Sequence, residues 1–119
     1  MGNPKGMAIG FLCLVIFGLL LIFLLTNFRN KYYTPGVQLY EHGNYNGAIQ
    51  DFDQDLKLFP DNAPDYYYLG MCEVRLGNID KGRILLVRAQ EIGENSTHGA
   101  SWVDGAVTAE LGKLSAANH

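Results

Sequence analysis

Hydrophobic residues are arranged in two different ways along this chain. Residues 7–25 form a run that contains no charged side chain, whereas after residue 34 apolar residues recur at spacings of three and four between polar ones. The second pattern is typical of helices that bury one face. A helix over the first run would be roughly 30 Å long, which is about the hydrocarbon thickness of a bilayer. The sequence therefore predicts an all-α chain with a polar leader at residues 1–6 and a single transmembrane helix at residues 7–28.

A cleaved signal peptide is the competing interpretation of the apolar run. The apolar core of such a peptide is shorter, and a cleavage site of small residues follows it. Here the run ends in the residues LTNFR at positions 25–29, which is a poor cleavage site. We therefore expect a retained single-pass anchor, with the lipid bilayer as one partner. Lys5 lies on one side of the run, and Arg29 and Lys31 lie on the other, so the positive-inside rule barely discriminates the orientation.

The region after the membrane helix is predicted to form five shorter helices. Thr34 can cap the first of them, and Pro35 can occupy its first position, where a missing N–H is tolerated. Ser96 or Thr97 can cap the last helix. The expected helices cover about residues 35–41, 45–58, 65–76, 79–92 and 97–115, with breaks at turn residues such as glycine and proline. The expected buried positions are Ala48, Ile49, Phe52, Leu56 and Phe59 on the second helix, and Ala100, Val103, Val107, Leu111 and Leu114 on the last.

The body repeats itself with a period of 34 residues. A fixed period of this size indicates a stack of helix pairs, in which each pair buries one face on its neighbour. The residues that recur are Gly36 as Gly70, Gly43-Asn44 as Gly77-Asn78, and Tyr32-Tyr33 as Tyr66-Tyr67.

Residues 29–96 resemble two tetratricopeptide (TPR) repeats, at residues 29–62 and 63–96, and residues 97–119 resemble the capping helix and tail that end such a stack. The sequence departs from the family pattern at Pro35, which stands in place of a large apolar residue, and at Glu94, which replaces the closing proline. The resemblance implies that the inner helices line a concave surface that holds another polypeptide. The matching residues are Gly36, Gly43, Ala48, Phe52 and Pro60 in the first repeat, and Tyr66, Leu69, Gly70, Gly77, Gly82, Leu86 and Ala89 in the second.

The resemblance implies a protein–protein interaction module at a membrane, which acts as a scaffold or as an accessory or assembly subunit of a membrane complex. Its expected ligand is an extended or helical apolar peptide, or a neighbouring subunit. The carboxylate clamp of TPR domains that grip chaperone C-termini looks absent, because Tyr33, Val37 and Tyr68 stand at its positions. Packing of Tyr67 and Met71 on the final helix or on the membrane-proximal segment is an equal alternative to groove contact. By resemblance, the groove would be lined by Tyr33, Val37, Tyr40, Glu41, Tyr67, Met71, Val74 and Arg75.

Three glycines, Gly6, Gly10 and Gly18, lie along the apolar segment. Small residues let helices approach closely in lipid, where packing drives helix association. These glycines are therefore candidates for contact with another membrane helix, from a different protein or from a second copy of this chain.

The start of the chain also resembles the type IV pilin-like subunits. In those proteins a peptidase cuts after a Lys-Gly pair, here Lys5-Gly6, and the apolar helices bundle into a filament core. The glutamate that usually lies five residues past the cut is Phe11 here. The alternative function is therefore a pilin-like subunit, whose apolar helices form a filament core with the TPR heads outside.

Composition argues against nucleic-acid binding and catalysis. From residue 35 to the end the chain carries twelve Asp or Glu and six Lys or Arg, whereas a nucleic-acid face needs clustered cations. The scattered histidines and the two cysteines show no metal-ligand spacing, and there is no glycine-rich phosphate loop. The alternation of Asp51, Asp53 and Asp55 lacks the glycine and the bidentate glutamate of a calcium loop. These three residues are instead expected to form a solvated helix face. We therefore expect no enzymatic activity, no cofactor and no bound metal.

Overall fold

Helices account for nearly all of the residues that the computed structural model describes, which are 4–96 and 100–117. The five helices of this part are α1 (Pro4–Glu41), α2 (Tyr45–Leu58), α3 (Ala63–Arg75), α4 (Ile79–Asn95) and α5 (Ser101–Ala117). The all-α prediction is confirmed for these residues. The chain divides into two compact units, Met1–Lys31 and Tyr32–His119, which are described one at a time. We call the second unit the helical body.

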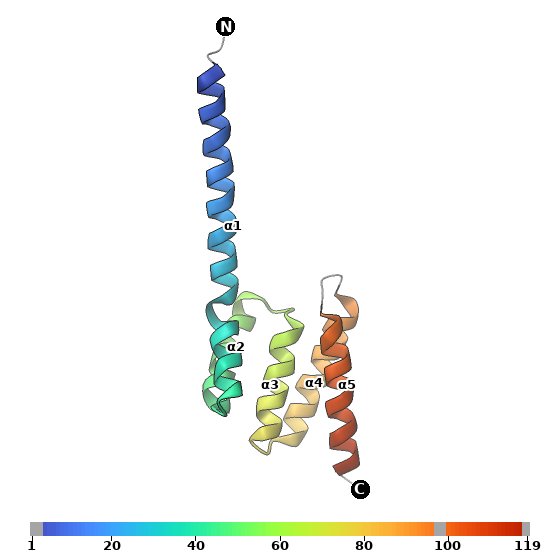
Figure 1. The fold of residues 1–119 in the computed structure, drawn as a ribbon. Helices are drawn as coiled ribbons and strands as arrows, with labels where there is room; N and C mark the ends of the chain where they lie inside the picture. Colours follow the sequence, from blue (N-terminus) through green and yellow to red (C-terminus); the bar gives the residue numbers. More distant parts are fainter. Residues whose placement is uncertain (1–3, 97–99, 118–119) are drawn as a thin grey trace. The chain divides into compact units, whose positions relative to one another are not determined.

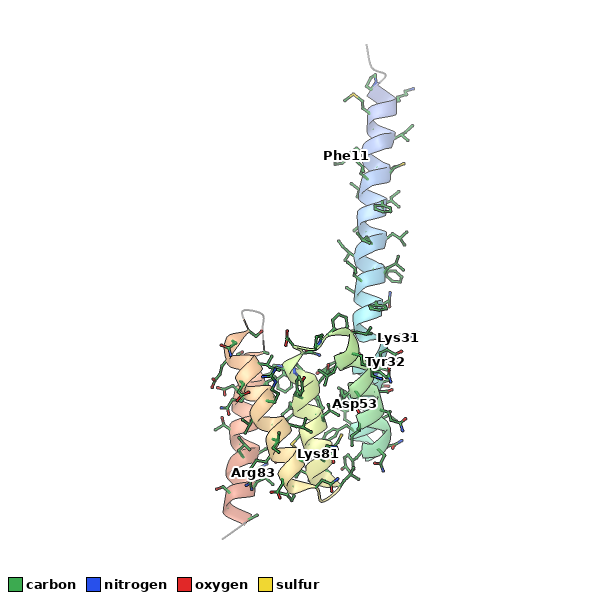
Figure 2. All side chains as sticks on the ribbon, turned by 180° about the vertical axis from the view of Figure 1, so that it is seen from behind. Phe11, Lys31, Tyr32, Asp53, Lys81 and Arg83 are labelled. Atoms are coloured by element: carbon green, nitrogen blue, oxygen red, sulfur yellow. The ribbon has the colours of Figure 1, made fainter. Side chains whose placement is uncertain are left out.

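The first unit is the apolar part of α1. Its large side chains are exposed, for example Phe11 at 71 % and Phe17 at 65 %, and Figure 2 shows Phe11 pointing away from the helix. Helix α1 is long and apolar enough to cross a membrane. A signal sequence near an N-terminus would meet the same two criteria. A side chain at Gly6, Gly10 or Gly18 would meet no described atom within 4 Å. Residues 1–3 of the predicted leader lie outside the described residues.

The predicted helix start at Thr34 and Pro35 is wrong. Helix α1 continues through this point to Glu41, with Pro35 inside it. A proline inside a helix removes one backbone donor and clashes with the preceding turn. Tyr33, Val37 and other side chains on both sides of the proline nevertheless pack against the same hydrophobic cluster. Because this packing needs helical spacing through residue 35, the tertiary contacts offset the local penalty.

Two glycine turns, 34 residues apart, have the same backbone structure. Gly43 and Gly77 have φ values of 80° and 89°, in the left-handed region that glycine enters without a steric penalty. The glycine N–H donates to the carbonyl of Tyr40 at 3.0 Å in the first turn and of Val74 at 3.1 Å in the second. In both turns the next residue, an asparagine, donates to a carbonyl five residues back at 2.8 Å. Both turns are therefore Schellman motifs, and the sequence period is also a period of the backbone.

Helix α3 lies at the centre of the helical body (Figure 1). It packs against α2 on one side and against α4 and α5 on the other. The predicted stripes on the second and last helices are confirmed at their fully buried positions, while Ile49, Leu56, Phe59 and Leu111 are only partly buried. One core cluster consists of Ala48, Phe52, Leu69 and Cys72. The other consists of Ala63, Met71, Leu86, Ala89, Ala100, Val103, Val107 and Leu114.

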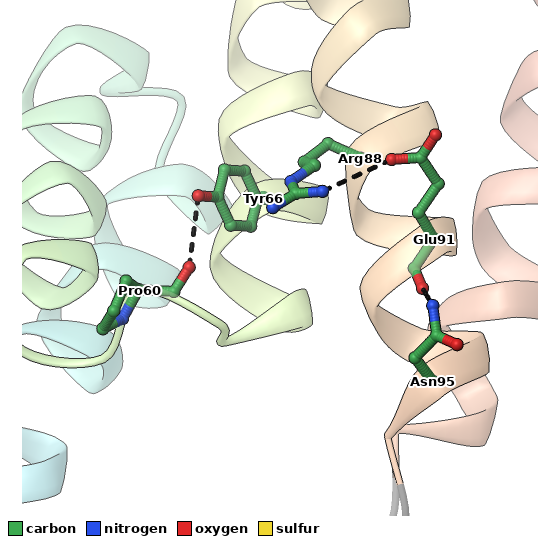
Figure 3. Close-up of polar contacts among 5 residues, drawn as sticks. All are labelled: Pro60, Tyr66, Arg88, Glu91 and Asn95. Carbon is green, nitrogen blue, oxygen red and sulfur yellow. Dashed lines mark hydrogen bonds and ion pairs between the residues drawn. The ribbon is translucent and has the colours of Figure 1, made fainter.

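The helix ends differ from the predicted ones by a few residues. Helix α3 begins at Ala63 because Pro64 fits its first turn, and the Tyr66 hydroxyl, which donates to the Pro60 carbonyl at 3.2 Å, holds the preceding turn (Figure 3). Helix α4 does not stop at residue 92 but continues to Asn95, whose side chain donates to the Glu91 carbonyl at 2.7 Å. Helix α5 begins at Ser101 rather than near residue 97. The proposed cap Thr97 lies outside the described residues.

Candidate partner-binding surface

Five aromatic side chains of the helical body form one contiguous set, which we call the aromatic surface. Tyr33 and Tyr40 come from α1, Tyr67 and Tyr68 from α3, and Trp102 from α5. The ring centroids of Tyr68 lie 6.1 Å from Tyr33, 5.4 Å from Tyr40 and 5.2 Å from Tyr67. Tyr67 in turn lies 5.5 Å from Trp102. The rings thus connect three helices that are far apart in sequence.

Tyr68 is the ring that joins this surface to the core. It stacks on Phe52 with a centroid distance of 5.3 Å and an angle of 7° between the planes, and Phe52 itself is fully buried. Tyr33 meets Phe52 edge to face at 6.0 Å. Offset and edge-to-face pairs of this kind contribute beyond the area that they bury. The aromatic surface is therefore held in place by the buried cluster beneath it.

The aromatic surface is only partly covered by the chain itself. The four tyrosines are half-buried, and Trp102 is 45 % exposed. Burial is the largest cause that raises the pKa of Tyr33, Tyr67 and Tyr68 above the ordinary tyrosine value, so all three hydroxyls are neutral. Neutral tyrosine and tryptophan rings with one wet side are favoured at the centres of protein interfaces.

Charged groups lie at the edge of the aromatic surface. After burial, the carboxylate of Glu41 is the next cause that raises the pKa of Tyr68, and Glu110 contributes to the raised pKa of Tyr67. Glu110 is itself paired with Lys113 at 2.9 Å. A hydrogen bond with Tyr40 is the main cause that raises the pKa of Arg75. The surface thus has an apolar centre with charges of both signs around it.

The structure brings some of the predicted groove residues together and separates others from solvent. Tyr33, Tyr40 and Tyr67 share the aromatic surface, and Val37 packs partly buried against the cluster beneath it. Met71 is only 3 % exposed and belongs to the same cluster as Val103 and Val107 of α5. It therefore packs on the final helix, which is one of the alternatives to groove contact. Val74 is partly buried against that cluster too, whereas Glu41 and Arg75 are exposed near the ends of α1 and α3.

Two members of the aromatic surface were missing from the predicted groove, Tyr68 and Trp102. Trp102 precedes the buried Val103 on α5, so a helical wheel already places it beside the buried stripe rather than on it. A large aromatic residue at the edge of an apolar stripe was the signal that could have found it. The resemblance places Tyr68 at a position of the carboxylate clamp and not in the groove lining.

In the described part of the chain, no three Cys, His, Asp or Glu side chains lie close enough together to hold a metal ion. The surface of α2 carries an open, polar depression lined by Gln50, Asp51, Asp53, Gln54 and Lys57. No protein-family description and no curated protein matches this chain.

Proposed function

We propose that this chain is a single-pass membrane protein whose helical body binds a protein partner through the aromatic surface. It would act as a scaffold or as an accessory subunit of a membrane complex. The observation that carries this proposal is the set of contiguous, partly exposed rings on α1, α3 and α5, in the same chain as a long apolar helix. An exposed aromatic set of this kind is typical of interface centres rather than of catalytic sites.

We further propose that the helical body is a pair of TPR repeats with α5 as the capping helix. The two identical glycine turns and the period of 34 residues support this assignment. A stack of only two repeats lies near the lower limit for independent stability. A permanent partner, or a second copy of the chain, would therefore stabilise the helical body by binding its folded state.

The proposal predicts that Trp102→Ala weakens partner binding by about thirtyfold or more, because truncation of a central interface tryptophan typically costs 2 kcal/mol or more. The measurement is purification of the full-length chain from its native membranes in mild detergent, with the stoichiometry of the co-purified protein as readout. Ile84→Ala is the matched control, since Ile84 is 70 % exposed and lies on α4, a helix that contributes no ring to the aromatic surface. Equal recovery of the partner with Trp102→Ala and with wild type would contradict the proposed surface.

The pilin-like alternative is supported by one observation, the Lys5-Gly6 pair directly before the apolar run. Two measurements separate the proposals. A mature protein that lacks its first six residues, and that sediments as a sheared filament, supports the filament subunit. A protein of unprocessed mass, recovered as a detergent-solubilised particle, supports the membrane-anchored interaction module.

A further inference from the structure

Two carboxylic acids are buried together between α2 and α3. Asp55 of α2 is 1 % exposed and Asp65 of α3 is fully buried. The side-chain amide of Asn62, in the turn between the helices, donates to Oδ2 of Asp65 at 2.7 Å and to Oδ2 of Asp55 at 3.4 Å. None of the ion pairs seen among residues 4–96 and 100–117 involves either acid. The two side chains therefore lie together in the core, and the group between them is the Asn62 amide rather than a cation.

Each of the two acids has one carboxyl oxygen that accepts no hydrogen bond from the described residues. These atoms are Oδ1 of Asp55 and Oδ1 of Asp65, and both are buried. Two ionised carboxylates would leave both atoms unpaired and would repel each other in a medium of low dielectric constant. A proton on one carboxyl makes it a donor to the other, which removes the repulsion and supplies the missing hydrogen bond. The site is therefore complete only with one proton.

The groups around Asp65 favour its protonated form. Burial is the largest cause, followed by the hydrogen bond with Asp55, and they raise the pKa of Asp65 to about 8, against the opposite effect of the hydrogen bond from Asn62. From α1, Tyr33 lies close enough to the two acids that both of them, after burial and Tyr68, help to raise its pKa. The titratable groups that face Asp65 are thus Asp55 from α2 and Tyr33 from α1.

We propose that Asp55 and Asp65 share one proton and act as a proton-dependent lock between α2 and α3. While the proton is held, the two acids form a hydrogen bond that joins the helices. When it is lost, two negative charges face each other in the core, and the contact between α2 and α3 weakens. Because Tyr33 belongs to the aromatic surface, release of the lock would also weaken partner binding, and this consequence alone rests on the proposed function.

The direction of the pH effect is opposite to that of an aspartate in a salt bridge. Asp65 has a higher pKa in the folded chain than the value of about 4 in an unfolded chain. Its contribution to stability is therefore complete below about pH 4 and is lost as the pH rises through about 8. Between these limits, the titration of Asp65 should raise the unfolding equilibrium constant about tenfold for each pH unit.

The test is urea unfolding of the full-length chain in detergent micelles, followed by the fluorescence of Trp102, the single tryptophan of the chain. Asp65→Asn keeps the shape of the protonated acid and its ability to donate to Asp55. Between about pH 5 and pH 7, we expect the folding equilibrium constant of wild type to fall about 100-fold more than that of Asp65→Asn. Asp61→Asn, at an exposed position of the same turn, should keep the wild-type dependence. The same pH dependence in wild type and Asp65→Asn would overturn the lock.

A second readout does not depend on the folding of a variant. The infrared spectrum of folded wild type should contain the carbonyl band of a protonated carboxylic acid at about pH 6, where exposed acids are ionised. This band should disappear as the pH is raised through about 8, and its absence at about pH 6 would overturn the proposal. Neither readout needs a partner. The lock can therefore fail while the proposed function holds, and the proposed function can fail while the lock holds.

Discussion

Phe52→Ala is expected to lower the free energy of unfolding of the helical body by about 3–5 kcal/mol. The Phe52 ring is fully buried, stacks on Tyr68, and meets Tyr33 edge to face. It also fills the space beside Gly36, where an added methyl group would meet the ring at 3.0 Å. Removal of the ring therefore leaves a cavity under the aromatic surface and takes away the support of two of its members.

Urea unfolding of the full-length chain in detergent micelles, followed by Trp102 fluorescence, measures this loss. Ile84→Ala removes an aliphatic side chain from an exposed position of α4, and we expect it to change stability by no more than about 0.5 kcal/mol. A Phe52→Ala variant that stays within about 1 kcal/mol of wild type would show that the cluster between α1, α2 and α3 does not hold the helical body together.

Gly82→Ala is expected to have the second largest effect, a loss of about 1–3 kcal/mol or more from overpacking. A Cβ at Gly82 would lie 2.6 Å from Cγ2 of Val74 and 2.9 Å from the backbone oxygen of Gly70. The side chain of Val74 can turn aside, but the backbone of α3 cannot move without disturbing its contacts with α2 and α5. Because α3 and α4 touch through their backbones here, any side chain has to push the two helices apart.

The matched control is Gly112→Ala in α5. A Cβ at this exposed helical position would meet no described atom within 4 Å. Alanine in a helix is favoured over glycine by roughly 0.5–1 kcal/mol, so this variant should be slightly more stable than wild type. The same urea unfolding measurement gives both values. A Gly82→Ala variant as stable as Gly112→Ala would mean that α3 and α4 do not approach as closely as the structure has them.

The candidate site could be predicted only in part, because its members reach one surface through packing rather than through sequence spacing. Tyr33, Tyr40 and Tyr67 were expected from the resemblance to TPR repeats, whose inner helices line a common side. Trp102 reaches Tyr67 only because α5 returns against α3 and α4. Met71 lies on the same helix as Tyr67 and was expected in the groove on the same resemblance, yet α5 covers it.

The turns and the helix stripes were accessible from sequence because each depends on a few neighbouring residues. Glycine at residues 43 and 77 ends a helix locally, by entering a backbone conformation that other residues avoid. The apolar run at residues 7–25 and the stripes on the later helices likewise determine where helices form and which face is buried. These features required no knowledge of what lies across the core.

Residues whose environment is made by distant segments were decided by the tertiary structure. Pro35 carries a local signal for a helix start, yet packing on both sides of it keeps α1 continuous. Asp55 was expected to be part of a solvated acidic helix face, but the packing of α3 against α2 buries it near Asp65. The physical reason is the same in both cases: local propensities are worth about 1–3 kcal/mol, and burial against a neighbouring helix changes the free energy by as much or more.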